Sequence, residues 1–258
     1  MKLAKILSSF FLTVFITFSI ADGAEWSYEE QNRWGSIQDH NQHEVPYMYP
    51  YAVCGIGQHQ SPVDLAASSV SKRLNNLKFH YYADKPDFFN TGHAVQVNLS
   101  DGYKGELLVG REAYPLIQLH FHEPSEHVVG TKSFPAELHF VHVREDGKIA
   151  VLGVLLEIGK DNPVFQSILE NTPHVEGESQ NDSGVWLNIA NLLPEKRNEY
   201  YTLAGSLTTP PCSEGVDWYI LTDTTEISES QLTQLKSFFS GNARLPQELN
   251  HRTIAKKK

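Results

Sequence analysis

Four segments of the chain have the residue pattern of β-strands, and this pattern constrains the fold more than any other feature. Apolar and polar residues alternate in HAVQVNL (93–99), LIQLHFH (116–122) and ELHFVHV (137–143), whereas IAVLGVLLEI (149–158) is a continuous apolar run. Alternation is typical of a strand with one buried face, and a continuous run is typical of a strand buried on both faces. We therefore expect a large, twisted, mostly antiparallel central sheet.

Helix signals are few and lie outside these strands. Asn162 before Pro163 predicts a short helix that runs through Glu170. Ser228 and Gln231 form a capping box before a second apolar helix pattern, which consists of Leu232, Leu235, Phe238 and Phe239. We expect this helix to end at Gly241. The expected fold class is mainly β (α+β), a single domain with short surface helices on the central sheet.

The first 24 residues have the features of a signal peptide. Lys2 and Lys5 precede an apolar stretch over 6–20, and small residues follow that suit cleavage after Ala21 or Ala24. An uncleaved membrane anchor is the alternative, but the stretch is short for a membrane span and contains several Ser and Thr residues. We expect residues 1–24 to be the leader and residues 25–258 to form one catalytic domain, with the protein periplasmic or secreted.

The net charge limits the possible partners of the protein, and the cysteines bear on its cellular compartment. The formal net charge is -10, which argues against nucleic acid as a partner and, once the leader is removed, against a membrane. Export implies an oxidising compartment, so the two cysteines, Cys54 and Cys212, are interpreted as a disulfide pair. Two buried free thiols are the alternative.

The segment QLHFHEPSEH (118–127) contains three histidines and two glutamates. It does not fit a metalloprotease helix, because His122 and His127 are five residues apart and Pro124 would break the helix. On a strand, Gln118, His120 and His122 share one face, and a neighbouring strand can add Glu137 and His139. A hydrogen-bonding residue then stands two positions before a histidine on both strands, as metal-bound imidazoles require. A set of hydrogen-bonded core histidines is the alternative.

Three neutral imidazoles without a fourth protein ligand describe an open zinc site, and carbonic anhydrase is the standard example of its chemistry. Seven segments in order make the chain resemble the alpha class of carbonic anhydrases, exported bacterial type. They are QSPVDL (60–65), NTGHAVQV (90–97), QLHFHEPSEH (118–127), AELHFVHV (136–143), AVLG (150–153), GSLTTPPC (205–212) and NAR (242–244).

The resemblance implies a zinc cofactor (Zn²⁺) and a set of site residues. The zinc ligands would be His120, His122 and His139, supported by Gln118, Glu137 and the main-chain carbonyl of Asn242. The hydroxyl of Thr208 would donate to Glu126 and accept a hydrogen bond from zinc-bound hydroxide. Carbon dioxide would lie against an apolar wall, with Thr209 also lining the cavity; the wall residues would be Val141, Val151, Leu207 and Trp218.

A histidine shuttle completes the implied mechanism. His93 matches the residue that passes protons to buffer, a task that suits an imidazole because it titrates near neutral pH. Tyr28 matches a tyrosine that orders water nearby. The chain departs from the family pattern at Ser27 and at Leu203, where a glycine and a tyrosine are usual, so one hydroxyl of the outer hydrogen-bond network is missing.

The resemblance therefore implies a lyase that interconverts carbon dioxide and bicarbonate and is inhibited by sulfonamides and anions. It is also compatible with a homodimer. Two other functions fit the sequence less well, because the presence of Thr208 together with Glu126 argues against both. One is a noncatalytic module related to carbonic anhydrase, which would typically lack a ligand histidine; the other is a metal oxygenase that uses two histidines and a carboxylate.

Overall fold

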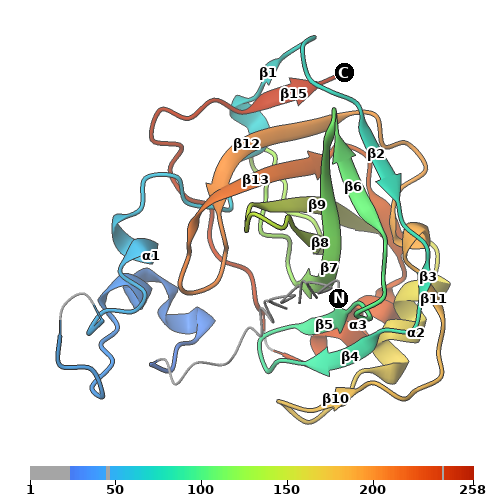
Figure 1. Ribbon diagram of the computed structural model, residues 1–258, viewed down its shortest axis with the longest axis horizontal. Helices are drawn as coiled ribbons and strands as arrows, with labels where there is room; N and C mark the ends of the chain where they lie inside the picture. Colours follow the sequence, from blue (N-terminus) through green and yellow to red (C-terminus); the bar gives the residue numbers. More distant parts are fainter. Residues whose placement is uncertain (1–23, 45–46, 240) are drawn as a thin grey trace, which may run out of the picture.

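The computed structural model describes residues 24–44, 47–239 and 241–258 (Figure 1). Residues 1–23 of the predicted leader, including the Ala21 cleavage site, lie outside the described residues. The strands are β1 (Ser69–Val70), β2 (Leu77–His80), β3 (Ala83–Asp84), β4 (Asp87–Asn90), β5 (Val95–Asn98), β6 (Glu106–Val109), β7 (Glu112–His122), β8 (Ala136–Val143), β9 (Ile149–Ile158), β10 (Ser179–Gln180), β11 (Leu187–Asn188), β12 (Tyr200–Ser206), β13 (Glu214–Leu221), β14 (Thr225–Ile227) and β15 (Ala255–Lys257). The helices are α1 (Val53–Ile56), α2 (Pro163–Asn171) and α3 (Glu229–Lys236), with 3-10 helices η1 (Tyr28–Ser36), η2 (Leu65–Ala67) and η3 (Ile189–Leu192).

Thirteen of the described strands form one sheet, and its main path runs β1-β15-β12-β13-β9-β8-β7-β5-β4-β10. Strand β14 pairs with β9, β2 pairs with β6, and β6 pairs with β7, while β3 and β11 form a separate two-stranded sheet. Pairing is antiparallel except where β1 meets β15 and where β9 meets β13 and β14. The predicted fold is therefore confirmed as one domain with a large, mostly antiparallel central sheet.

Strand β9 is buried on both faces, as its continuous apolar sequence predicts. Every residue from Ala150 to Leu156 is buried. Leu152 joins a core that includes residues of α2 and α3, which lie together in Figure 1. Val151 joins a second core on the opposite face of the sheet, next to Trp218. The sheet thus separates a helix-covered core from a second face that carries the site described below.

The two predicted helices are present, but the second is shorter than expected. The Asn162 side chain accepts hydrogen bonds from the first turn of α2, and the Ser228 capping box begins α3. The prediction that α3 continues through Phe239 toward Gly241 is wrong, because the helix ends at Lys236. The chain tightens there into a turn in which the Phe238 amide donates to the Leu235 carbonyl. Phe238 and Phe239 still pack against the core, but from a loop.

The prediction that a strand begins at His93 is also wrong, because β5 begins at Val95. His93 lies in a tight turn in which the Thr91 hydroxyl accepts from the His93 and Ala94 amides. Gly92 has a φ of +79°, a conformation that favours glycine. The turn breaks the alternation at the first two residues of the predicted strand.

His142 lies on the face of β8 opposite to His139 and is fully buried. Its Nδ1 donates to the Ala150 carbonyl over 3.2 Å, and its Nε2 accepts from the Tyr81 hydroxyl over 2.7 Å. Burial lowers the pKa of His142 to about 3. This imidazole is therefore neutral in the folded protein at neutral pH.

We expect His142 to make the folded state less stable in acid. The unfolded chain binds a proton at this position below about pH 6.5, whereas the folded chain binds it only near pH 3. The free energy of unfolding should therefore fall as the pH falls through this window, by about 1.4 kcal/mol per pH unit. In urea denaturation between pH 4 and 8, the His142→Gln variant should have a flatter profile than the unsubstituted protein. Parallel profiles would contradict this prediction.

Cys54 and Cys212 form a disulfide with a Cα–Cα distance of 5.0 Å, as predicted. Cys54 lies in α1. Cys212 lies in the segment between β12 and β13, which also contains Thr208. The bond closes a loop with a sequence separation of 158. In the chain-entropy account, a loop of this size stabilises the fold by roughly 4–5 kcal/mol.

Reducing this disulfide should lower the free energy of unfolding by about 4–5 kcal/mol. The Cys54→Ser variant, the Cys212→Ser variant and the double variant should lose equal amounts, because each removes the same bond. Mass spectrometry of unreduced protein should detect no free thiol. Two free thiols in protein recovered from an oxidising compartment would contradict the pairing.

Candidate metal centre

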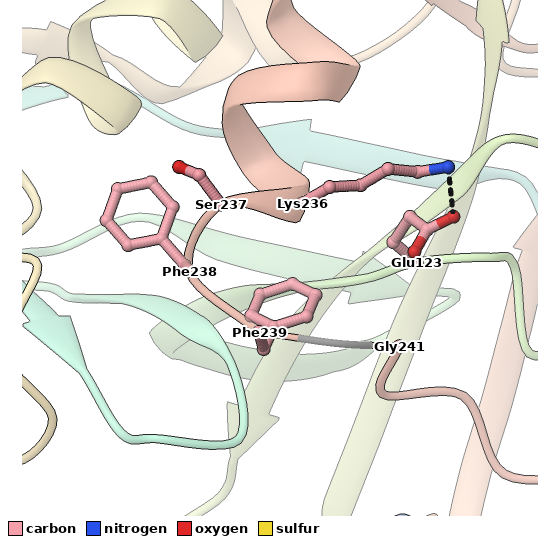
Figure 2. Close-up of a pocket in the computed structure, with 6 residues that line it drawn as sticks. All are labelled: Glu123, Lys236, Ser237, Phe238, Phe239 and Gly241. Carbon is pink, nitrogen blue, oxygen red and sulfur yellow. Dashed lines mark ion pairs between the residues drawn. The ribbon is translucent and has the colours of Figure 1, made fainter.

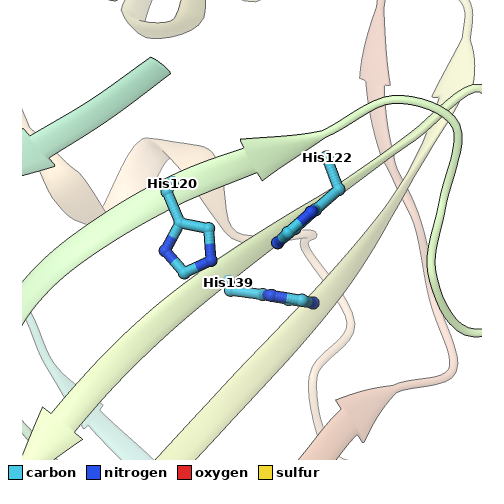
Figure 3. Close-up of side chains that lie close together, drawn as sticks. All are labelled: His120, His122 and His139. Carbon is cyan, nitrogen blue, oxygen red and sulfur yellow. The ribbon is translucent and has the colours of Figure 1, made fainter. Parts of the chain in front are cut away.

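Three histidines on two adjacent strands converge on one point (Figure 3). His120 on β7 is directly opposite His139 on β8, and His122 is opposite Glu137. The ring centroids of the three histidines are 4.5 to 5.2 Å apart. Each ring offers one nitrogen within 4.8 Å of the others. The period of two along β7, combined with the antiparallel register, produces this cluster.

The other nitrogen of each ring is fixed by a hydrogen bond. The three bonds run from His120 Nδ1 to Gln118 Oε1 (2.9 Å), from His122 Nδ1 to the Asn242 carbonyl (2.8 Å) and from His139 Nε2 to Glu137 Oε1 (2.9 Å). The nitrogens left for a ligand are therefore Nε2 of His120, Nε2 of His122 and Nδ1 of His139. His122 Nε2 is buried and has no hydrogen-bond partner among the described residues. A buried nitrogen without a partner and two more aimed beside it fit a zinc ion.

The protonation states of the three rings also suit a metal. Burial and the neighbouring imidazoles lower the pKa of His120 well below its ordinary value. Burial lowers the pKa of His122 to about 4 and also lowers the pKa of His139. All three rings are therefore neutral near pH 7, and only a neutral imidazole has a lone pair for a metal.

Glu137 orients His139 and is itself held from several directions. Its Oε1 accepts from His127 Nδ1 over 2.8 Å, and its Oε2 accepts from the amides of Glu126 and His127. Burial raises the pKa of Glu137, but His127 and His139 outweigh this effect and hold the pKa well below its usual value. Gly153 leaves room for the carboxylate, since a Cβ there would lie 3.0 Å from Glu137 Oε1. The sequence interpretation assigned no role to His127, although it stands in the same histidine-rich segment.

Glu126 lies beside two of the three histidines, His122 and His139. Its Oε2 is 3.5 Å from His122 Nε2 and 3.9 Å from His139 Nδ1, and its Oε1 accepts from the Arg244 amide over 2.9 Å. Burial raises the pKa of Glu126 to about 6, and the adjacent Thr208 side chain is among the groups that oppose the rise. The carboxyl group is therefore largely ionised at pH 7 and can accept a hydrogen bond from a neighbouring hydroxyl. The sequence interpretation missed the contact with Arg244.

An apolar row lies next to the histidines on the same face of the sheet. Val141, Val151 and Trp218 are directly opposite one another across β8, β9 and β13, and Leu207 packs against this core. Thr208 is buried, whereas Leu207 and Thr209 are partly exposed. The five residues predicted for an apolar pocket thus occupy adjacent strands and the loop that carries Thr208.

His93 and Tyr28 belong to an aromatic group at the edge of the site. The His93 ring meets the Trp26 ring edge-on at a centroid distance of 4.1 Å, and the Tyr28 ring is 6.3 Å from His93. Burial, followed by the charge of Glu126, raises the pKa of Tyr28 well above its ordinary value. The Tyr28 hydroxyl therefore keeps its proton near neutral pH.

The two departures from the family pattern occupy different surroundings. Ser27 uses its main-chain carbonyl, which accepts from Trp34 Nε1 over 2.7 Å, so its side chain is not part of that contact. Leu203 is buried opposite Trp218, and the Trp218 ring packs on His127 at 4.8 Å. His127 Nε2 is buried without a hydrogen-bond partner among the described residues. A side chain without a hydroxyl at position 203 is consistent with this unpaired nitrogen.

A cluster of three histidines, two of them buried and one partly exposed, on a large and mostly antiparallel sheet defines a mainly-β protein with a candidate metal centre. The sequence model of eukaryotic-type carbonic anhydrase matches residues 40–258, and the chain belongs to this family. A carbonic anhydrase from Neisseria gonorrhoeae is 35% identical over 94% of this chain and 92% of its own length. The alpha-carbonic anhydrase of Thermovibrio ammonificans, solved with the inhibitor sulfanilamide, is 36% identical with a TM-score of 0.81, covering 90% of this chain and 99% of its own. Dioscorin, solved with ascorbate, is 27% identical with a TM-score of 0.77, covering 88% and 92%.

Proposed function

We propose that the protein catalyses the reversible hydration of carbon dioxide to bicarbonate and a proton, with zinc as its cofactor. The observation that carries this proposal is the convergence of three neutral, oriented imidazole nitrogens beside Glu126 and an apolar wall. Family membership supports the same reaction. His120, His122 and His139 would hold the zinc. When bound in such a site, zinc lowers the pKa of a water to about 7 and so supplies a nucleophile at neutral pH.

Thr208 and Glu126 would orient the attacking oxygen. An ionised Glu126 would accept a hydrogen bond from the Thr208 hydroxyl, so the hydroxyl oxygen could then only accept hydrogen bonds from the cavity side. An attacking oxygen beside Thr208 must then use its hydrogen for this bond, which turns a lone pair toward the substrate. The Thr208 amide would stabilise the negative charge that develops on a bicarbonate oxygen, and Thr209 would line the cavity next to it.

The apolar wall suits a substrate without charge. Carbon dioxide has no net charge and no hydrogen to donate, so apolar side chains can hold it without competing polar contacts. Val141, Val151 and Trp218 form a continuous row beside the histidines, and Leu207 borders that row. We propose this wall as the carbon dioxide site and expect sulfonamide and anion inhibitors to bind in the same cavity.

His93 would carry the released proton to buffer. An acid of pKa near 7 that gives its proton only to water turns over at roughly 10³ per second. This rate is the product of an association limit of about 10¹⁰ M⁻¹s⁻¹ and an acid dissociation constant of about 10⁻⁷ M. Faster turnover needs a base near the surface, and His93 is partly exposed at the edge of the site. The protonated Tyr28 hydroxyl would help to order the waters between His93 and the histidine cluster.

We further propose that residues 1–24 are a signal peptide, that residues 25–258 form the mature catalytic domain, and that the protein works in the periplasm or outside the cell. The disulfide supports this assignment, since such bonds persist in oxidising compartments. Across the described ranges 24–44, 47–239 and 241–258, no helix combines the length and apolar character needed to cross a membrane.

A stopped-flow hydration assay tests the proposed reaction. Purified protein should accelerate carbon dioxide hydration, lose that activity after zinc is removed by a chelator, and be inhibited by a sulfonamide. A noncatalytic binding module would bind zinc without accelerating hydration. That result, obtained with protein containing one zinc per chain, would exclude the proposed reaction.

A further inference from the structure

Asn242 is fully buried and hydrogen-bonds through every polar atom that it has. Its amide donates to the Glu123 carbonyl over 3.0 Å, and its carbonyl accepts from His122 Nδ1 over 2.8 Å. Its Oδ1 accepts from the Glu123 amide over 2.7 Å. Its Nδ2 donates to the carbonyls of His93 and Phe121, each over 2.8 Å.

These bonds connect three segments that are distant in the sequence. The Asn242 side chain bonds to the turn that carries His93, at a sequence separation of 149, and to Phe121 near the end of β7, at a sequence separation of 121. Only an asparagine-like amide fits, because the position needs one acceptor and two donors on the same planar group. The same residue therefore joins the proton-carrying turn to the strand that holds two of the three clustered histidines.

The link to His93 is of particular interest because it holds the His93 backbone from outside the turn, whereas the other outside contact, with Trp26, is to the ring. The His93 amide bonds within the turn, to the Thr91 hydroxyl. The His93 carbonyl bonds to Asn242. Among the hydrogen bonds of the described residues, none involves the His93 imidazole. The position of the ring relative to the metal centre therefore depends on where the backbone is held and on the packing of the ring against Trp26.

We propose that Asn242 is a positioning residue for proton transfer, because its side-chain amide fixes the distance between His93 and the metal centre. This inference rests on the proposed function and adds a side-chain role to a residue whose main-chain carbonyl already contacts His122. Proton transfer through ordered water depends steeply on geometry, and a displacement of about 1 Å can cost as much as 100-fold in rate.

One substitution at Asn242 can disrupt its donated side-chain bonds and keep its contacts with Glu123 and His122. Glu123 is held from a second side by Lys236, whose Nζ lies 3.0 Å from Glu123 Oε1 (Figure 2). In the Asn242→Asp variant the bond from the Glu123 amide and the main-chain bond to His122 are both retained. A carboxyl group donates one hydrogen bond when protonated and none when ionised, so it cannot keep both bonds to the carbonyls of His93 and Phe121. The substitution thus weakens the tie between the His93 turn and β7 while the contact to His122 remains.

Asn242→Asp should lower kcat by about tenfold in weak buffer and leave kcat/KM within about twofold. Imidazole-type buffers should restore most of kcat. Amide hydrogen exchange at His93 and Ala94 should accelerate by about tenfold in the zinc-free and the zinc-loaded protein, because the turn opens more often. The exchange measurement does not depend on activity.

A double-mutant cycle separates positioning from general damage. If Asn242 acts on kcat through His93, then Asn242→Asp should cause no further loss of kcat in a His93→Ala background. Asn162→Ala is the matched control, since it removes a side-chain cap from α2, remote in sequence from the site. This control should be less stable to urea, with kcat and exchange at His93 unchanged.

An additive loss in the double variant would overturn the proposal, as would a fall in kcat/KM equal to the fall in kcat. Unchanged exchange at His93 would overturn it as well. If Asn242→Asp does not fold, Asn242→Ser serves for the same measurements, because its short hydroxyl cannot replace both donated bonds. Failure of the unsubstituted protein to hydrate carbon dioxide would refute the proposed function instead, and the exchange result would still report whether Asn242 holds the turn.

Discussion

Replacement of His139 with alanine is expected to lower zinc affinity by more than about 100-fold and to remove nearly all hydration activity. Two imidazoles would remain, and the buried Glu137 would lose one of its two imidazole partners. The same outcome is expected for His120→Ala and His122→Ala, because each ring supplies one of the three converging nitrogens. Metal analysis after dialysis, paired with stopped-flow kinetics, measures both effects.

His80→Ala provides the control for this experiment. His80 is exposed and lies near Glu106 on the β2–β6 pair, outside the histidine cluster. Zinc content and hydration rate should be unchanged in that variant. A His139→Ala protein that keeps one zinc per chain and the full rate would show that the cluster is not the metal site.

The second large effect is expected at Thr208. Thr208→Ala should lower kcat/KM by about 100-fold, because the hydroxyl would orient the attacking oxygen during the chemical step. Added buffer should not restore the rate. His93→Ala should show the opposite pattern, with kcat/KM and zinc content retained, kcat lowered by about tenfold, and kcat restored by small imidazole buffers.

A buffer titration of both variants in one assay distinguishes the two steps. If His93→Ala loses kcat/KM as severely as Thr208→Ala, or gains nothing from buffer, then His93 does not carry the proton. If buffer restores Thr208→Ala, then the hydroxyl belongs to proton transfer and the orienting role assigned to Thr208 is wrong.

The local sequence pattern predicts the sheet and much of the geometry of the histidine cluster. A strand has a period of two, so Gln118, His120 and His122 must share a face, and an antiparallel neighbour can place His139 opposite His120. The observed register has this pairing. The continuous apolar run of β9 likewise predicts burial on both faces.

Other features depend on contacts between distant segments, which local patterns do not contain. His93 belongs to a turn because Thr91 and Gly92 shape the backbone there, although the alternation of apolar residues suggests a strand. Helix α3 stops at Lys236, and the apolar residues Phe238 and Phe239 that suggested a longer helix bury themselves from a loop. The side-chain contacts of Asn242 cross more than a hundred residues, and no sequence periodicity records them.

The catalytic zinc site is tested most directly by a zinc titration of the metal-free protein, with hydration of carbon dioxide measured at each addition. Activity should rise in proportion to added zinc and level off at one equivalent, and a sulfonamide should abolish it. The His139→Ala protein should stay inactive over the same range. Activity that is full before zinc is added, or that stays absent at one bound equivalent, would contradict the assignment of the three histidines as a catalytic zinc site.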